Sequence, residues 1–266
     1  MYYNTLIDII VSTWNNPEVI KRLVLSLEKN SNLKNSTSIY VHVQENNQKT
    51  TEFLKSKNIQ FSVSSTNIGM CSGLNMAAKL GKGQYICIID DDMYVGKDWD
   101  SELIGFKNNN KLIESDLLCS VSVESQGANP LALLRDYGSF LDFNETGFNN
   151  DIEVLKKQKP ILCNHGSVPL LINRTFWEKI EGYDERFNPS PGAEEGIAMK
   201  AWIQGCRNFI QVPTSIVYHF QSMSTNRIAG HNYAERREKI FSESYNITVS
   251  EFVKMYIKRG EVWEKR

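Results

Sequence analysis

The sequence predicts an α/β fold, with a single domain built on a Rossmann-like, mixed but mostly parallel central sheet flanked by helices. Apolar runs alternate with amphipathic segments through the first hundred residues, as expected when strands and helices alternate along a parallel sheet. The strand-like runs are almost continuously apolar, which is typical of strands that helices cover on both faces. A chain of 266 residues is also within the range of one α/β domain.

The elements of the first hundred residues can be placed in order. An apolar run at residues 6–11 predicts a strand, and Asn16 and Pro17 suit the start of a helix that continues to about Asn30. The next segments are predicted to be a strand, a helix, a strand, a helix and a buried strand: SIYVHVQ, KTTEFLKSK, IQFSV, GMCSGLNMAAKLG and YICII.

The pattern is weaker after Asp92. Residues 127–159 mix Gly, Asn, aromatic and charged residues without a sustained period, so we expect an irregular segment there. Beyond it the sequence predicts a strand at 167–172, a helix from about 174, a helix at 194–204 and a strand pair around 209–218. Residues 221–266 are expected to form a loop and a helical extension.

Composition excludes several classes of protein. Thirty basic and 31 acidic residues nearly cancel, so the chain lacks the positive field that non-specific nucleic-acid binding needs. Five scattered cysteines without a CxxC pair argue against a disulfide framework or a zinc site and favour a reducing, cytoplasmic compartment. No stretch approaches the ~20 apolar residues of a transmembrane helix. The aromatic and basic tail suits either a helix packed on the domain or a peripheral membrane contact.

Three consecutive carboxylates, Asp90, Asp91 and Asp92, directly follow the buried strand YICII. They repel one another unless protons or a cation compensate them, and their hard oxygen atoms suit Mn²⁺ or Mg²⁺. Such an ion can hold the two phosphates of a nucleotide sugar. The competing interpretation is a solvated acidic turn.

Polar side chains also end the other predicted strands. Because the carboxyl ends of parallel strands meet at one edge of a sheet, we expect them to converge on one ligand. They fall in three groups before the acidic triplet: STWN at 12–15, QENN at 44–47 and STN at 65–67.

These motifs resemble family-2 glycosyltransferases in their order: VSTWNN, ENNQ, then NIGMCSGLNMAAKLGKGQYICIIDDDMYV. The resemblance implies a GT-A fold with a nucleotide-binding half at about 1–95 and an acceptor-binding, catalytic half at about 96–220. It also implies an inverting hexosyltransferase with a DxD motif, a UDP-sugar as the favoured donor and a carbohydrate, lipid-linked or protein acceptor. The implied donor-binding residues are Ser12, Thr13, Trp14, Glu45, Asn67, Gly69, Asp90 and Asp91. The implied metal ligands are Asp92, Asp90 and His219.

A second stretch, INRTFWEKIEGYDERFNPSPGAEEGIAMKAWIQGCRNFIQVPTSIVYH, is similar to the part of the family that carries the catalytic base. Inversion requires a base that removes the proton of the acceptor hydroxyl. The resemblance implies Glu195 as this base and Glu194 as its partner or an acceptor contact. Glu195 stands where the family commonly has aspartate, and Ile197 and Lys200 replace other family residues. Carboxylates in the first turn of a helix can also be purely structural.

Three further points remain open from the sequence. Arg227 or His231 could close a loop over a diphosphate, or the segment could be a plain connection. A nucleotidyltransferase of similar fold is a rival, although STWNNPE has neither the glycine nor the basic residue of a phosphate loop. A sugar-binding or nucleotide-binding relative without turnover is the other rival.

Overall fold

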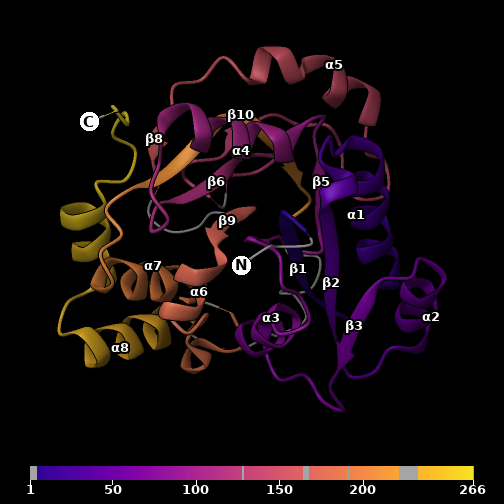
Figure 1. Ribbon diagram of the computed structural model, residues 1–266, viewed down its shortest axis with the longest axis horizontal. Helices are drawn as coiled ribbons and strands as arrows, with labels where there is room; N and C mark the ends of the chain where they lie inside the picture. Colours follow the sequence, from indigo (N-terminus) through magenta and orange to yellow (C-terminus); the bar gives the residue numbers. More distant parts are fainter. Residues whose placement is uncertain (1–4, 128, 164–167, 191, 222–232, 266) are drawn as a thin grey trace.

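One mixed sheet crosses the molecule, and helices cover both of its faces (Figure 1). The computed structural model describes residues 5–127, 129–163, 168–190, 192–221 and 233–265. Within these residues the order of strands is β3-β2-β1-β4-β9-β6-β10-β5, with β7 beside β6 and β8 beside β10. The strands are β1 (Ile7–Trp14), β2 (Thr37–Gln44), β3 (Gln60–Val63), β4 (Tyr85–Ile88), β5 (Met93–Val95), β6 (Leu117–Glu124), β7 (Leu133–Leu134), β8 (Ile161–Leu162), β9 (Leu170–Asn173) and β10 (Phe209–His219).

The helices connect these strands and then close the C-terminal side. They are α1 (Pro17–Asn30), α2 (Gln48–Ser56), α3 (Met70–Ala78), α4 (Trp99–Asn110), α5 (Glu145–Leu155), α6 (Arg174–Lys179), α7 (Ala193–Ile203), α8 (Tyr233–Tyr245) and α9 (Val249–Glu251). Two 3-10 turns, η1 (Lys34–Ser36) and η2 (Glu185–Phe187), and a π-helical segment, η4 (Phe252–Ile257), complete the described elements.

Strand β1 explains why the sheet is buried on both faces. Its neighbours β2 and β4 run parallel to it, and its side chains alternate between two hydrophobic cores. Ile9 and Val11 pack with α1 and α4, whereas Ile10 packs with α3, α6 and α7. The mixed, mostly parallel sheet with helices on both faces confirms the predicted fold class.

A buried ion pair joins the two halves of the chain. Arg174, at the start of α6, places Nη2 2.6 Å from Oδ2 of Asp8 on β1, and Asp8 is fully buried. The Arg174 Nε also donates to the carbonyl of Gly83, at 2.7 Å. Removing one partner of such a pair leaves an uncompensated buried charge. The contact therefore holds α6, which follows β9, against β1.

The second half of the chain differs from the sequence prediction. The predicted strand pair is the single strand β10, whose register against β6 shifts between Val212 and Ile216. Residues 127–159 contain α5, which starts where the Asn144 side chain accepts a hydrogen bond from the amide of Gly147. The prediction also lacked α4 and β6. Both follow Asp92, where we had expected less regular structure.

The C-terminal helices pack onto the same core as α3 and α7. Phe241 of α8 and Phe252 of η4 are both fully buried. No helix among the described residues is long and apolar enough to cross a membrane. All five cysteines are buried, and none of them forms a disulfide.

Candidate active site

Three of the predicted metal ligands lie together at the carboxyl edge of the sheet. Asp90, Asp92 and His219 each offer one ligand atom, and these atoms all lie within 4.8 Å of one another. The sheet brings them together because β5 pairs antiparallel with the end of β10, with Met93 opposite His219. We call these three residues the acidic cluster. Two carboxylates and an imidazole form a donor set that suits Mn²⁺ and related divalent ions.

His219 is held in place by a residue that the sequence did not single out. Its Nδ1 lies 3.0 Å from Oε1 of Glu124, at the end of β6, and its Nε2 lies 3.3 Å from Oδ1 of Asp92. Glu124 is 1% exposed and also accepts a hydrogen bond from the Gln221 side chain, at 2.7 Å. A carboxylate on one ring nitrogen leaves the other nitrogen directed at a metal, which is the usual support for a histidine ligand. In the sequence, Glu124 could have been recognised as a polar residue at the end of the strand-like run LLCSVSVE, like the polar residues that end the other strands.

Asp91 occupies a different position from its two neighbours. It is 7% exposed, and Oδ2 accepts a hydrogen bond from Oγ1 of Thr13, at 2.6 Å. This contact joins the end of β1 to the loop after β4. Asp91 therefore fixes the loop that carries Asp90 and Asp92, and it does so through Thr13 at the end of β1.

The electrostatics of the cluster favour a bound cation. Burial, followed by the charge of Asp92, raises the pKa of Asp90 to about 6 and the pKa of Asp91 to about 8. Burial opposes a charge on His219, but Asp92 and then Glu124 raise its pKa well above the usual 6.5. Without a cation, this corner of the protein retains protons to offset its negative charge. A divalent ion would displace those protons on binding.

Gln44, at the end of β2, links the other strand ends. Its Nε2 donates to Oγ of Ser12 at 3.2 Å and to the carbonyl of Gly69 at 3.0 Å, while its Oε1 accepts from the amide of Ile68 at 2.9 Å. Asn67 Oδ1 accepts from the amide of Gly69, at 2.9 Å. Of the predicted donor-binding residues, Ser12, Asn67 and Gly69 thus belong to one hydrogen-bonded network around Gln44.

The loop before α3 depends on close packing at Gly69. Gly69 has φ +87°, and a Cβ there would lie 2.4 Å from the Asn188 side chain. Asn188 Oδ1 accepts from the amide of Cys71 at 3.0 Å, and the amide of Met70 donates to the Pro189 carbonyl at 2.9 Å. These amides of the first turn of α3 are therefore already satisfied, so α3 does not offer them to a phosphate as a phosphate loop would.

Glu45 and Trp14 lie at the outer end of the same edge. Glu45 is exposed, with φ +59°, and its Oε2 accepts from the side chain of Asn15 at 2.7 Å. Trp14 is half-buried, and its indole Nε1 is buried without a hydrogen-bond partner among the described residues. A buried N–H of this kind can be satisfied by a ligand carbonyl or hydroxyl.

Glu194 and Glu195 begin α7 but have different surroundings. Gly192, with φ +93°, precedes the helix where a Cβ would lie 2.6 Å from the Arg237 side chain. Glu195 Oε1 lies 3.4 Å from Nη1 of Arg237, on α8. Burial, followed by the charges of Glu195 and Asp90, raises the pKa of Glu194 to about 8. The charge of Asp90, one member of the acidic cluster, thus contributes to the raised pKa of Glu194.

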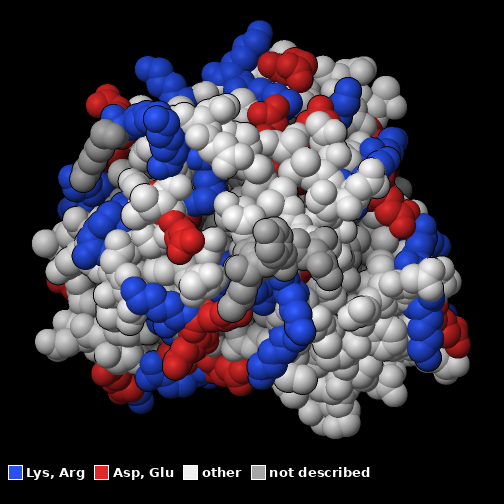
Figure 2. All heavy atoms as spheres, viewed as in Figure 1, with Lys and Arg blue, Asp and Glu red and all other residues white. Residues whose placement is uncertain are grey.

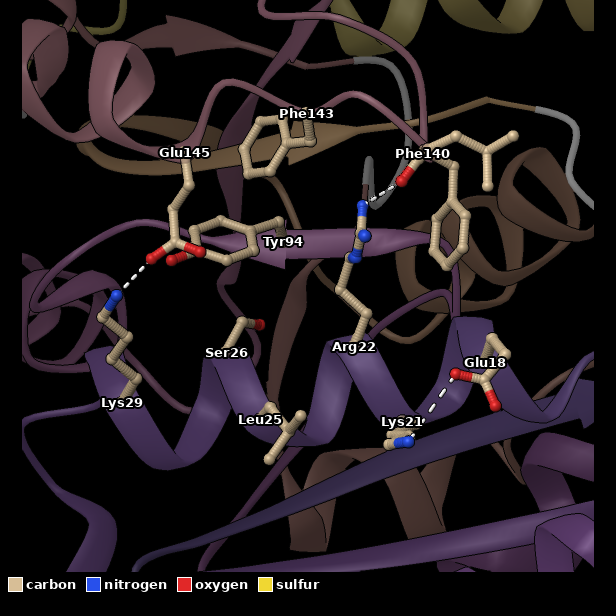
Figure 3. A pocket seen from close by; sticks show the side chains of 11 residues that line it. Glu18, Lys21, Arg22, Leu25, Ser26, Lys29, Tyr94, Phe140, Phe143 and Glu145 are labelled. Atoms are coloured by element: carbon tan, nitrogen blue, oxygen red, sulfur yellow. Dashed lines mark hydrogen bonds and ion pairs between the residues drawn. The ribbon is translucent and has the colours of Figure 1, made fainter.

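A cleft of about 480 Å³ borders this edge, between α1, Tyr94 and the loop before α5 (Figure 3). Its basic side chains have partners within the protein: Lys29 pairs with Glu145, and Lys21 lies 3.7 Å from Glu18. The Arg22 guanidinium donates to the carbonyl of Phe140 and lies 4.1 Å from the centre of its ring. The cleft therefore has little unpaired charge. Arg227 and His231, the predicted loop residues, lie outside the described part of the chain.

Comparison with known proteins agrees with this arrangement. The glycosyl transferase family 2 domain matches residues 8–153, more than half of the chain. This chain belongs to glycosyl transferase family 2. The assignment agrees with the resemblance that the DxD motif and its flanking segments suggested. No curated protein sequence matches the chain significantly.

Several solved structures share the fold of this chain. The structure of S. aureus TarS residues 1–349 with UDP-GlcNAc is 16% identical, with a TM-score of 0.64, and the match covers 93% of this chain and 69% of that one. GalNAc-T7 with UDP, GalNAc and Mn²⁺ is 15% identical, with a TM-score of 0.64 and coverage of 94% and 56%. The mannosyltransferase PcManGT from Pyrobaculum calidifontis, with GDP-Man and Mn²⁺, is 14% identical, with a TM-score of 0.59 and coverage of 98% and 66%. The match spans little more than half of the GalNAc-T7 chain. It covers 59% of the chain in a second structure of TarS 1–349. These similarities establish the GT-A fold.

Proposed function

We propose that this chain transfers a sugar from a nucleotide-diphosphate sugar, with a UDP-sugar as first choice, to an acceptor hydroxyl with inversion. The observation that carries the proposal is the convergence of Asp90, Asp92 and His219 within 4.8 Å at the edge of the sheet. Family membership and neighbours that hold UDP-GlcNAc, or GDP-Man with Mn²⁺, support the same function. The acceptor would be a carbohydrate, a lipid-linked molecule or a protein.

Asp90, Asp92 and His219 would hold the divalent cation, Mn²⁺ or Mg²⁺. The hard oxygen atoms and the imidazole fit such an ion, and Glu124 supports the imidazole from behind at 3.0 Å. When bound, the cation neutralises charge on the departing diphosphate. Ser12, Thr13, Trp14, Glu45, Asn67 and Gly69 would surround the nucleotide. Trp14 Nε1, which has no hydrogen-bond partner in the described part of the chain, would donate to it. Asp91 would contribute by fixing the loop through Thr13.

We assign the role of base to Glu194 in preference to Glu195. Glu195 already has a partner in the protein, because its Oε1 lies 3.4 Å from Nη1 of Arg237. Burial and the charges of Glu195 and Asp90 raise the pKa of Glu194 to about 8, so its ionised form is a stronger base than an ordinary carboxylate. In the transfer it takes the proton of the acceptor hydroxyl as that oxygen bonds to the anomeric carbon. The bond from that carbon to the diphosphate breaks on the opposite side, and the nucleoside diphosphate leaves.

The test is product release from a panel that includes UDP-GlcNAc and GDP-Man, with and without Mn²⁺. The proposal expects release of nucleoside diphosphate that requires the cation. Release of pyrophosphate from nucleoside triphosphate and sugar phosphate would instead identify a nucleotidyltransferase. Tight nucleotide-sugar binding without any turnover, over a broad panel of acceptors, would identify a binding protein.

A further inference from the structure

A second cavity, of about 560 Å³, is lined by Glu195 of α7, by residues of α8 and by residues between Val249 and Glu261. We call it the C-terminal cavity. Its charged lining comprises the basic residues Arg237, Lys254, Lys258 and Arg259 and the acidic residues Glu195, Glu238 and Glu261. Figure 2 shows Lys and Arg side chains gathered along the left margin of the molecule, over the C-terminal segment that Figure 1 draws in yellow.

The basic groups of this cavity are poorly neutralised. Lys254, Lys258 and Arg259 form no ion pair with any residue that the structure describes. Arg237 has one long contact, 3.4 Å to Glu195, and its Nε is buried without a partner among the described residues. One of the acidic groups is already engaged, because Glu238 Oε1 accepts a hydrogen bond from the amide of Val249 at 3.0 Å.

The cleft in Figure 3 provides an internal comparison. There Lys29 pairs with Glu145, and Arg22 is bonded to the Phe140 carbonyl. Those cations are satisfied by the protein itself. In the C-terminal cavity Lys254, Lys258 and Arg259 have no such partner among the described residues, and an anion with several acceptor oxygens would satisfy them together.

We propose that the C-terminal cavity binds a phosphate ester carried by the acceptor substrate. The four basic side chains of the lining outnumber the three acidic ones, which favours an anion, and Val249 and Val253 supply an apolar wall for the adjoining carbon atoms. The location suits an acceptor because Glu195, which lines this cavity, is adjacent in α7 to Glu194, the proposed base. The donor diphosphate has its own site at that cluster. The assignment to an acceptor rests on the proposed glycosyltransfer.

The experiment uses the whole chain in EDTA, so that phosphate cannot bind through a metal at the acidic cluster. Glycerol 3-phosphate is titrated and followed by broadening of its ³¹P signal, with uncharged glycerol, followed by its own proton signals, as the comparison ligand. We expect saturable binding of the phosphate ester alone. Lys258→Gln/Arg259→Gln should weaken it by about tenfold or more, as expected for the loss of charge-assisted hydrogen bonds.

The matched control is Lys34→Gln/Lys55→Gln, which removes the same charge at two exposed sites away from the cavity and should leave binding unchanged. Equal weakening in both double variants, or no saturable binding by the wild type, would overturn the proposal. Sedimentation with phosphatidylglycerol vesicles that depends on Lys258 and Arg259, without binding of glycerol 3-phosphate, would replace it with a membrane-surface role. A separate titration of the cavity variant with UDP-GlcNAc and Mn²⁺ should match the wild type. If neither protein binds that donor while glycerol 3-phosphate still binds, only the proposed function of the acidic cluster fails.

Discussion

The two groups of carboxylates at this site are held in opposite ways. In the triplet Asp90 to Asp92, the middle residue is bonded to Thr13, and Asp92 is tied through His219 to Glu124. In the pair on α7, Glu195 has one long side-chain contact within the described residues, with Arg237 at 3.4 Å, and Glu194 has a pKa raised to about 8. A rigid group suits a metal, whose ligands must keep their geometry. A group with raised proton affinity suits proton transfer.

The largest expected effect comes from Glu194→Gln, which removes the base and keeps the side-chain shape. Turnover should fall about 10²- to 10⁴-fold, the usual contribution of a positioned base. Donor affinity should stay at the wild-type value, because the acidic cluster is unchanged. The rate of nucleoside diphosphate release measures turnover, and calorimetric titration measures donor affinity. Turnover equal to the wild type would remove Glu194 from the mechanism.

Glu195→Gln is the matched change at the neighbouring position. It removes the negative charge opposite Arg237 but keeps an acceptor oxygen, so the free energy of unfolding should fall by about 1 kcal/mol. Turnover should stay much closer to the wild type than in Glu194→Gln. Denaturant titration and the same release assay measure both effects. If Glu195→Gln were the inactive variant and Glu194→Gln the active one, the roles of the two residues would be exchanged.

The dependence of stability on pH tests the electrostatic contrast. The folded-state pKa values of Asp91 and Glu194 are about 8, well above the usual values of 3.8 and 4.5, so the folded state holds more protons than the unfolded state in this range. Without metal, stability should therefore fall from about pH 7 to about pH 8.5. The raised pKa of His219 acts in the same direction, and burial lowers the pKa of His42, which titrates below this window.

Chemical denaturation in EDTA at the two pH values measures this slope. Mn²⁺ should reduce it, because the cation replaces the retained protons. Asp91→Asn, which removes one of the titrating groups, should also reduce it. A metal-free protein that gains stability over this interval would contradict the assigned pKa directions.

The smallest expected effect is that of Thr13→Val, which removes the hydroxyl bonded to Asp91 at 2.6 Å. Stability should fall by about 1 kcal/mol, a typical value for one hydrogen bond. Because the two residues form one contact, the losses in Thr13→Val and Asp91→Asn should not add in the double variant. Strictly additive losses would show that Asp91 does not depend on Thr13.

The sequence was most informative where local pattern and structure agree. The buried strand β4 and the three aspartates after it are adjacent in sequence, so their relation could be predicted. The contacts that support the cluster could not be predicted in this way. Glu124 reaches His219 across 95 residues, and Arg237 reaches Glu195 from a helix that the sequence assigned only to a general extension. The contact between Glu124 and His219 depends on β6 lying beside β10 in the sheet. The sequence did not predict β6.

The central claim is that Asp90, Asp92 and His219 hold a divalent ion that binds the donor diphosphate. Calorimetric titration of wild-type protein and Asp92→Asn with UDP-GlcNAc or GDP-Man, each with Mn²⁺ and with EDTA, tests it most directly. We predict that the wild type binds one of these donors only with Mn²⁺, and that Asp92→Asn loses this binding. Equal donor affinity in EDTA, or undiminished Mn²⁺-dependent binding by Asp92→Asn, would contradict the account.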